Sequence, residues 1–148
     1  MKLLFTWKKL SNYVATFRVE FGDQSFTFEG TDLIDSLSEM AEATALSILD
    51  NQAAEVAFEN EPGQHLLNMR PLCDGRVELT LSWVENPYTL FGEQSDKNIL
   101  FKGKVTNTEL LTAVVALLHQ AKEECGNSKF TLEDFKFPET AFKRLQNA

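Results

Sequence analysis

The stretch over residues 76–85 alternates between polar and apolar side chains, and this period of two restricts the fold more than any other feature of the chain. Successive side chains of a β-strand point to opposite faces, so the alternation predicts a strand with one buried face. Asp74-Gly75 lies between this stretch and a second β-rich run, residues 65–73. Asp-Gly between two such runs predicts a hairpin in which both turn residues have positive φ. Pro71 predicts that the first arm is a sheet edge or is bulged there.

The rest of the chain supplies further strands and three helices. Apolar residues recur at helical spacing after Thr31, whose side chain can accept a hydrogen bond from a free N–H of the first turn. Thr106 or Asn107 is expected to cap a second helix over residues 108–124, which is apolar most of the way round and should be the more buried one. Pro138 suits the first position of a short last helix. Further strands are predicted over residues 3–7, 13–21, 26–28, 55–59 and 99–105.

The resulting order, βββ-α-ββββ-αα, predicts the α+β class. We expect an antiparallel sheet of about six to seven strands, with two main helices on one face and a short C-terminal helix. A chain of 148 residues is most simply one domain, residues 1–148, because single cores commonly serve about 100–200 residues.

Cysteine usage and hydropathy predict a soluble cytoplasmic protein. Cys73 and Cys125 are far apart in the sequence and form no CxxC pair, as is typical of thiols in a reducing compartment. Lys8 and Lys9 interrupt the apolar start before it reaches the length of a signal peptide's apolar region. No run approaches the roughly 20 apolar residues that a membrane span requires.

Charge is distributed very unevenly along the chain. Residues 19–69 contain no Lys and no Arg, but they contain eleven of the 22 acidic residues. The rest of the chain holds the other eleven acids and all 14 bases, a balance of +3, so the net charge of −8 is concentrated in about one third of the sequence. A face of this kind attracts a basic partner and speeds association with it. The alternative is an acidic surface that only keeps the protein soluble.

The sequence contains no motif typical of an enzyme or a cofactor site. His65 has no second His or Cys at the spacing of metal ligands, and His119 is not part of an HExxH pattern. Gly103-Lys104 lacks the glycine-rich loop and the Ser or Thr of a phosphate-binding loop. We therefore expect no enzymatic activity, no cofactor and no metal.

Nucleic acid and membranes are also disfavoured as partners. Phosphate contacts require clustered Lys and Arg, whereas Lys97, Lys102 and Lys104 form only a small group on a predicted strand, where edge protection is the simpler role. Membrane-surface binding would require a basic amphipathic helix, which the chain lacks.

The order of motifs resembles that of the small α+β immunity proteins encoded beside bacterial polymorphic and contact-dependent growth-inhibition toxins. A strand that ends in the sequence FEG is followed by a helix that begins with TDL. A later strand ends in FENEPG, and the hairpin after it contains the sequence DGRVELTL. The residues that carry the resemblance are Phe28, Gly30, Asp32, Leu33, Leu37, Phe58, Glu59, Glu61, Pro62, Gly63 and residues 75–81. The resemblance covers about two thirds of the chain. It implies a cytoplasmic protein that binds a toxin domain, often a cationic nuclease, and blocks its active site or substrate surface. It implies no particular set of site residues.

On this hypothesis, carboxylates take the place of substrate phosphates, and two aromatic side chains from the loop over residues 88–97 act as anchors. The predicted partner-binding residues are Asp35, Glu39, Glu59, Glu61, Glu85, Tyr88, Phe91, Glu93 and Asp96.

Two alternatives remain open. One is a small-molecule-binding or enzymatic α+β domain whose site forms only in the fold, with His65 or His119 beside carboxylates in a deep pocket. The other is a nucleic-acid mimic, which would need acids spaced regularly along an elongated face. A flat acidic surface would favour the protein-binding hypothesis.

Overall fold

The computed structural model describes residues 2–9, 15–30, 35–60, 63–85, 97–127 and 138–148. Within these ranges the elements follow one another in the predicted order. They are β1 (Leu3–Lys9), β2 (Ala15–Phe21), β3 (Gln24–Gly30), α1 (Asp35–Ile48), β4 (Ala54–Asn60), β5 (Gly63–Pro71), β6 (Arg76–Val84), β7 (Asn98–Thr106), α2 (Asn107–Asn127) and α3 (Glu139–Gln146). The α+β class is confirmed.

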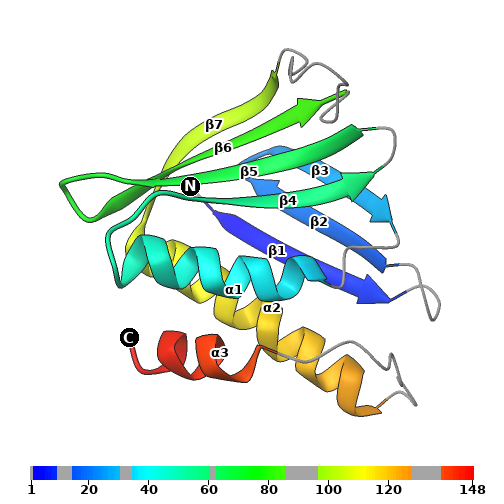
Figure 1. The fold of residues 1–148 in the computed structure, drawn as a ribbon, viewed down its shortest axis with the longest axis vertical. Coiled ribbons are helices and arrows are strands. Elements are labelled where there is room, and N and C mark those ends of the chain that lie inside the picture. Colours follow the sequence, from blue (N-terminus) through cyan, green and yellow to red (C-terminus); the bar gives the residue numbers. More distant parts are fainter. Residues whose placement is uncertain (1, 10–14, 31–34, 61–62, 86–96, 128–137) are drawn as a thin grey trace, which may run out of the picture.

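The described strands form two antiparallel sheets rather than one continuous sheet (Figure 1). A three-stranded sheet has the order β1-β2-β3, and a four-stranded sheet has the order β4-β5-β6-β7. Within each sheet, every strand pairs with the strands that precede and follow it in the sequence, as in successive hairpins. The break falls where α1 separates β3 from β4 in the chain.

A row of aromatic rings joins the two sheets. The alternating apolar residues of β1–β3 form one face, which packs against the inner face of β4–β7. Phe17 stacks on Phe58 with ring centroids 4.6 Å apart, and Phe28 lies 5.5 Å from the same ring. Further along, Phe21 stacks on Phe101 at 5.2 Å. These rings bury large apolar areas, which is the main stabilising contribution to a core of this kind.

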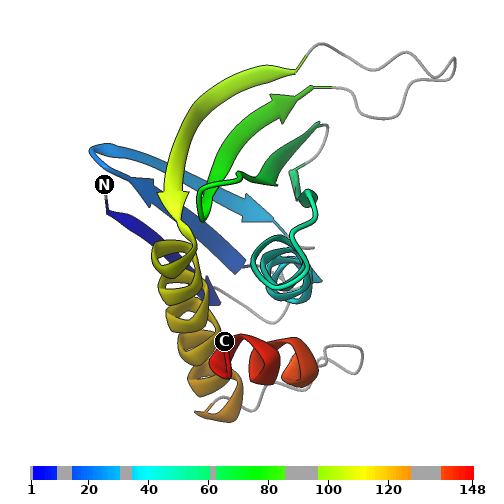
Figure 2. The ribbon, with the colours of Figure 1, turned by 90° about the vertical axis from the view of Figure 1, so that its left-hand side faces the viewer.

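The helices pack against the strands and against one another (Figure 2). α1 contacts β4 and β5, α2 contacts β1, and α3 contacts both longer helices. α2 is buried along one face, which includes Leu110, Val114 and Leu117. Its cap is Thr106 rather than Asn107, because the Glu109 N–H donates to Thr106 Oγ1 at 3.0 Å. Thr31 lies outside the described residues. None of the described helices is long and apolar enough to cross a membrane.

The β5–β6 hairpin turns differently from the prediction. Leu72 N donates to the Arg76 carbonyl oxygen at 2.8 Å, which encloses a loop of three residues rather than two. Gly75 has a φ of +79°, but Asp74 does not have a positive φ. A three-residue loop of this kind needs a left-handed residue only at its last position, so the prediction of two positive φ values is wrong. The Asp74 side chain instead accepts a hydrogen bond from Arg76 Nε at 2.8 Å.

Strand β5 is an inner strand, which corrects the prediction drawn from Pro71. It lies between β4 and β6, and its register with both neighbours is unbroken. Pro71 is tolerated because the pairing with β4 stops at Met69, opposite Ala54. Beyond that point a missing N–H disrupts no pairing on the β4 side.

Both outer edges of the four-stranded sheet are protected against pairing with another chain. On β4, Ser36 Oγ of α1 donates to the Ala57 carbonyl oxygen at 3.1 Å, and Ala57 N donates to Glu39 Oε2 at 3.3 Å. On β7, Lys102 and Lys104 are exposed, and the register with β6 shifts at a bulge. Bulges and edge lysines both discourage edge-to-edge association.

Candidate functional site

Several of the predicted partner-binding acids lie at one end of the four-stranded sheet. Because its strands alternate in direction, β4 and β6 end where β5 and β7 begin. Glu59 is near the end of β4, and Glu85 directly follows β6. Asp35 begins α1, and one turn later Glu39 bonds to Ala57, two residues before Glu59. We call the four residues Asp35, Glu39, Glu59 and Glu85 the acidic end.

The remaining predicted residues, Glu61, Tyr88, Phe91, Glu93 and Asp96, lie outside the described residues. The structure therefore places four of the nine predicted residues, those of the acidic end.

Bases from elsewhere in the chain partly neutralise the acidic stretch, which sequence reasoning did not find. Within the described ranges, its acids form exposed ion pairs with residues outside it. These pairs include Glu20–Arg18 at 2.8 Å, Asp50–Arg144 at 3.3 Å and Glu55–Lys97 at 3.7 Å. Exposed pairs contribute little to stability, but they lower the local negative charge. The acidic stretch is therefore less uniform in three dimensions than along the sequence.

Glu39 has a structural role in addition to its predicted one. Its carboxylate accepts the hydrogen bond from Ala57 N, so it satisfies a donor on the open edge of β4. Glu42, one turn later on α1, is exposed, and within the described part of the chain it forms no ion pair or hydrogen bond. Glu42 was not among the predicted residues, although its spacing of three from Glu39 could have suggested it.

His65 is packed among aromatic rings rather than beside carboxylates. Its ring stacks on Phe28 with centroids 4.0 Å apart and lies 4.7 Å from Trp83. Burial lowers the pKa of His65 to about 4, because the charged form loses its hydration there. Its Nδ1 atom is buried and has no hydrogen-bond partner among the described residues. The imidazole is therefore neutral at pH 7 and acts mainly as a packing group.

We predict that His65 makes the protein less stable in acid. The pKa of about 4 in the folded state lies below the usual histidine pKa of 6.5, so the unfolded chain binds the proton more readily. The stability associated with neutral His65 is fully present above pH 6.5 and is lost as the pH falls toward 4. Because the ring is only partly buried, we expect a loss of about 1–2 kcal/mol.

The measurement is urea unfolding of the wild type and of His65→Phe from pH 7 to pH 4. The difference in the free energy of unfolding between the two proteins should change with pH in favour of the variant as the solution is acidified. Carboxylates titrate in both proteins and cancel in this difference. Parallel stability curves would contradict the assignment.

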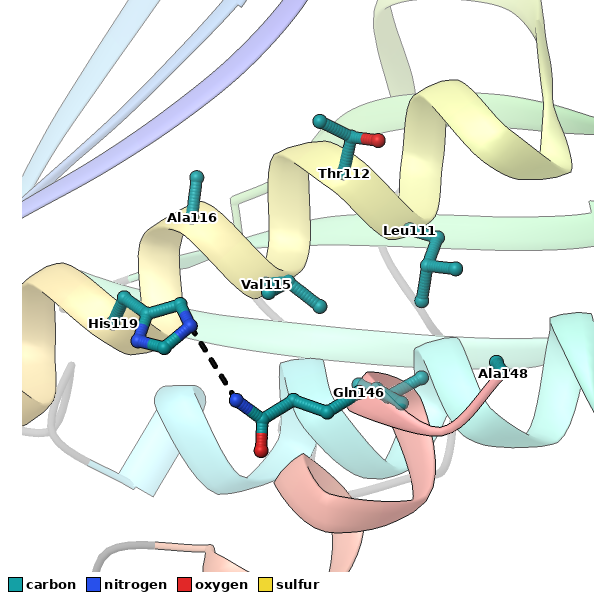
Figure 3. A pocket seen from close by; sticks show the side chains of 8 residues that line it. Leu111, Thr112, Val115, Ala116, His119, Gln146 and Ala148 are labelled. Atoms are coloured by element: carbon teal, nitrogen blue, oxygen red, sulfur yellow. Dashed lines mark hydrogen bonds between the residues drawn. The ribbon is translucent and has the colours of Figure 1, made fainter.

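The second histidine borders a groove between α2 and α3 (Figure 3). The groove has a volume of about 520 Å³ and is mainly apolar, with Leu111, Val115 and Leu145 among its lining residues. His119 Nε2 lies 3.4 Å from Gln146 Nε2, so one ring nitrogen is paired with the amide. None of the described residues that line the groove has a carboxylate side chain, so these residues do not form the histidine–carboxylate pair that general acid–base chemistry would use.

A smaller hollow lies on the outer face of the four-stranded sheet. Its volume is about 230 Å³, below the 300–1,000 Å³ typical of small-molecule sites. The bulge pairs Ser82 with Ile99 while Leu81 pairs with Phe101, so Leu100 is the extra residue and Ile99 turns outward. The side chain of Ile99 is 62% exposed and lies beside the Glu55–Lys97 pair. An exposed aliphatic side chain next to charged groups suits recognition of a protein surface.

Within the described ranges, no group of three or more His, Cys, Asp or Glu side chains is placed to hold a metal ion. The strongest arrangement on the described surface is therefore the acidic end, together with the exposed Ile99 near it. A comparison of the chain with protein-family models, with curated proteins and with solved structures finds no match.

Proposed function

We propose that the protein is a protein-binding domain, and specifically an immunity protein that binds the basic domain of a toxin. The observation that carries the proposal is the acidic end: Glu39 and Glu85 are exposed there, and the backbone positions of Asp35 and Glu59 lie at the same end of the sheet. Carboxylates held on a rigid sheet complement a cationic surface and raise the rate of association. Occlusion of the partner's active site or substrate surface would follow from binding alone, without catalysis.

A nuclease is the partner that this surface suits best. The active-site surface of a nuclease is cationic because it binds phosphates, and carboxylates can occupy the same positions. Exposed Ile99 would add apolar contact area beside the charges.

The test is a binding titration with a defined domain. The C-terminal domain encoded by the gene immediately upstream is expressed, and this protein is titrated into it by calorimetry at low and high salt. We expect one-to-one binding that weakens as salt rises, because salt screens exposed charges. Tight binding that is indifferent to salt would keep the immunity function and assign the affinity to apolar contacts. Absence of binding would refute the proposal.

Charge reversal provides a residue-level prediction. Glu85 is exposed at the end of β6, so the variant Glu85→Lys should fold normally. We expect it to weaken binding about tenfold at low salt, mainly through slower association, and to have a smaller effect at high salt. The matched control is Glu123→Lys, the same charge change on the exposed side of α2. Equal affinities for both variants and the wild type would contradict a role for Glu85.

A further inference from the structure

Helix α1 exposes one narrow stripe that combines acids with leucines. Glu39, Glu42, Leu46 and Leu49 are spaced by three, four and three residues, which places them on one face of a helix. Leu49 directly follows α1, and its N–H still donates to the Ala45 carbonyl oxygen at 2.9 Å. All four residues are exposed, whereas the other described side chains from Ser36 to Ile48 are buried or half-buried. We call these four residues the α1 stripe.

The apolar half of the α1 stripe is unusual for this surface. Leu46 is 37% exposed and Leu49 is 38% exposed, and Ile99 is the one other large hydrophobic side chain found exposed within the described ranges. Two leucines one turn apart form a small contiguous apolar area rather than two scattered residues. Such an area gains free energy when a partner covers it.

The charged half of the α1 stripe lies toward the acidic end. Glu39 belongs to both surfaces and bonds to Ala57 on β4. The last turn of α1 contains no basic residue, and the Asp50–Arg144 pair lies just beyond Leu49. From Glu39 to Leu49 the rise is about 15 Å, at roughly 1.5 Å per helical residue. The stripe therefore continues the acidic end and changes from anionic to apolar along its length.

We infer that the α1 stripe is part of the interface and receives a segment of the basic partner that carries cationic side chains about one to two helical turns from apolar ones. The inference rests on the proposed function. The cations would face Glu39 and Glu42, and the apolar side chains would cover Leu46 and Leu49. Complementary charge fixes the direction in which the segment lies, and the leucines supply affinity that salt does not screen.

A second copy of this chain would fit the α1 stripe poorly. In an antiparallel pairing, Leu46 and Leu49 of one copy would lie against the carboxylates of the other copy. Those carboxylates would lose hydration without gaining a cationic partner. In a parallel pairing, the acids of the two copies would face one another and repel. The charge pattern therefore favours a different, basic molecule.

The experiment measures affinity for the same upstream-encoded C-terminal domain by calorimetry at low and high salt. The double variant Leu46→Ser with Leu49→Ser should bind at least about tenfold more weakly at both salt concentrations, because apolar contacts are not screened. The matched control is Leu111→Ser, a half-buried leucine that lines the groove on α2, which should bind like the wild type. Thermal unfolding of each variant shows that it is folded.

A second variant avoids any effect on packing. Glu42→Lys changes an exposed side chain. We expect it to weaken binding about tenfold at low salt and less at high salt. Normal binding by both the leucine variant and Glu42→Lys, while the wild type binds tightly, would overturn this inference and leave the proposed function intact. No binding by the wild type would refute the proposed function and this inference with it. Self-association of the free protein that the leucine variant abolishes would assign the stripe to a second copy and overturn the inference.

Discussion

Replacing Phe58 with Ala is expected to lower the free energy of unfolding by about 3–5 kcal/mol. The side chain is fully buried, and its ring contacts Phe17 and Phe28 of the three-stranded sheet. Removing it would therefore leave a cavity between the two sheets, bordered by rings that cannot both move in to fill it. The measurement is urea unfolding followed by the fluorescence of Trp7 and Trp83.

The control for this prediction is a large aliphatic residue at the surface. Ile99→Ala removes a side chain that is 62% exposed, so the free energy of unfolding should change by no more than about 0.5–1 kcal/mol. A loss below about 1.5 kcal/mol for Phe58→Ala would mean that the sheets close over the cavity, contrary to the packing described above.

Replacing Gly63 with Ala is expected to cost about 3 kcal/mol, the upper part of the range for overpacking. A Cβ at this position would lie 2.5 Å from Trp83 Cζ2 and 2.5 Å from the Val84 carbonyl oxygen. The indole can move, but the backbone oxygen belongs to β6 and can move only if the two strands separate. The loss should appear as a lower urea midpoint with an unchanged dependence on urea concentration.

Gly103 provides the comparison. A Cβ there would clash with Phe21, and the three atoms nearest to it would all belong to the Phe21 ring. Gly103→Ala should therefore be rescued in part by Phe21→Leu, which shortens the obstructing side chain. Gly63→Ala should not be rescued by Trp83→Leu, because the backbone contact remains. Similar rescue at both glycines would contradict the distinction between side-chain and backbone obstruction.

The order and type of the elements followed from local patterns. Alternation and helical spacing are properties of short segments, so they predicted each strand and helix without knowledge of the rest of the chain. The division into two sheets could not be predicted in this way, because it depends on which strands pair across α1. The prediction for the turn at Asp74-Gly75 was wrong for a related reason. The length of the loop is set by the hydrogen bond from Leu72 N to the Arg76 carbonyl oxygen, which lies outside the Asp-Gly pair itself.

The candidate site was predictable only in part. The concentration of acids in residues 19–69 is visible in the sequence, and the alternating strand directions bring Glu59 and Glu85 to one end of a sheet. The sequence did not reveal that Arg144 would pair with Asp50, 94 residues away. It also did not reveal that Glu39 would hold the edge of β4, because both contacts require the finished fold.

The contacts between the N-terminal strands and elements much later in the chain also affect how the protein folds during synthesis. β1 packs on α2, and Phe21 stacks on Phe101. The apolar face of the three-stranded sheet is therefore covered by residues that follow it in the chain by about 80–120 positions. During synthesis the N-terminal strands leave the ribosome with their apolar face uncovered, and contacts of such long sequence separation form slowly. Truncation before α2 should therefore yield chains that aggregate rather than a folded N-terminal fragment.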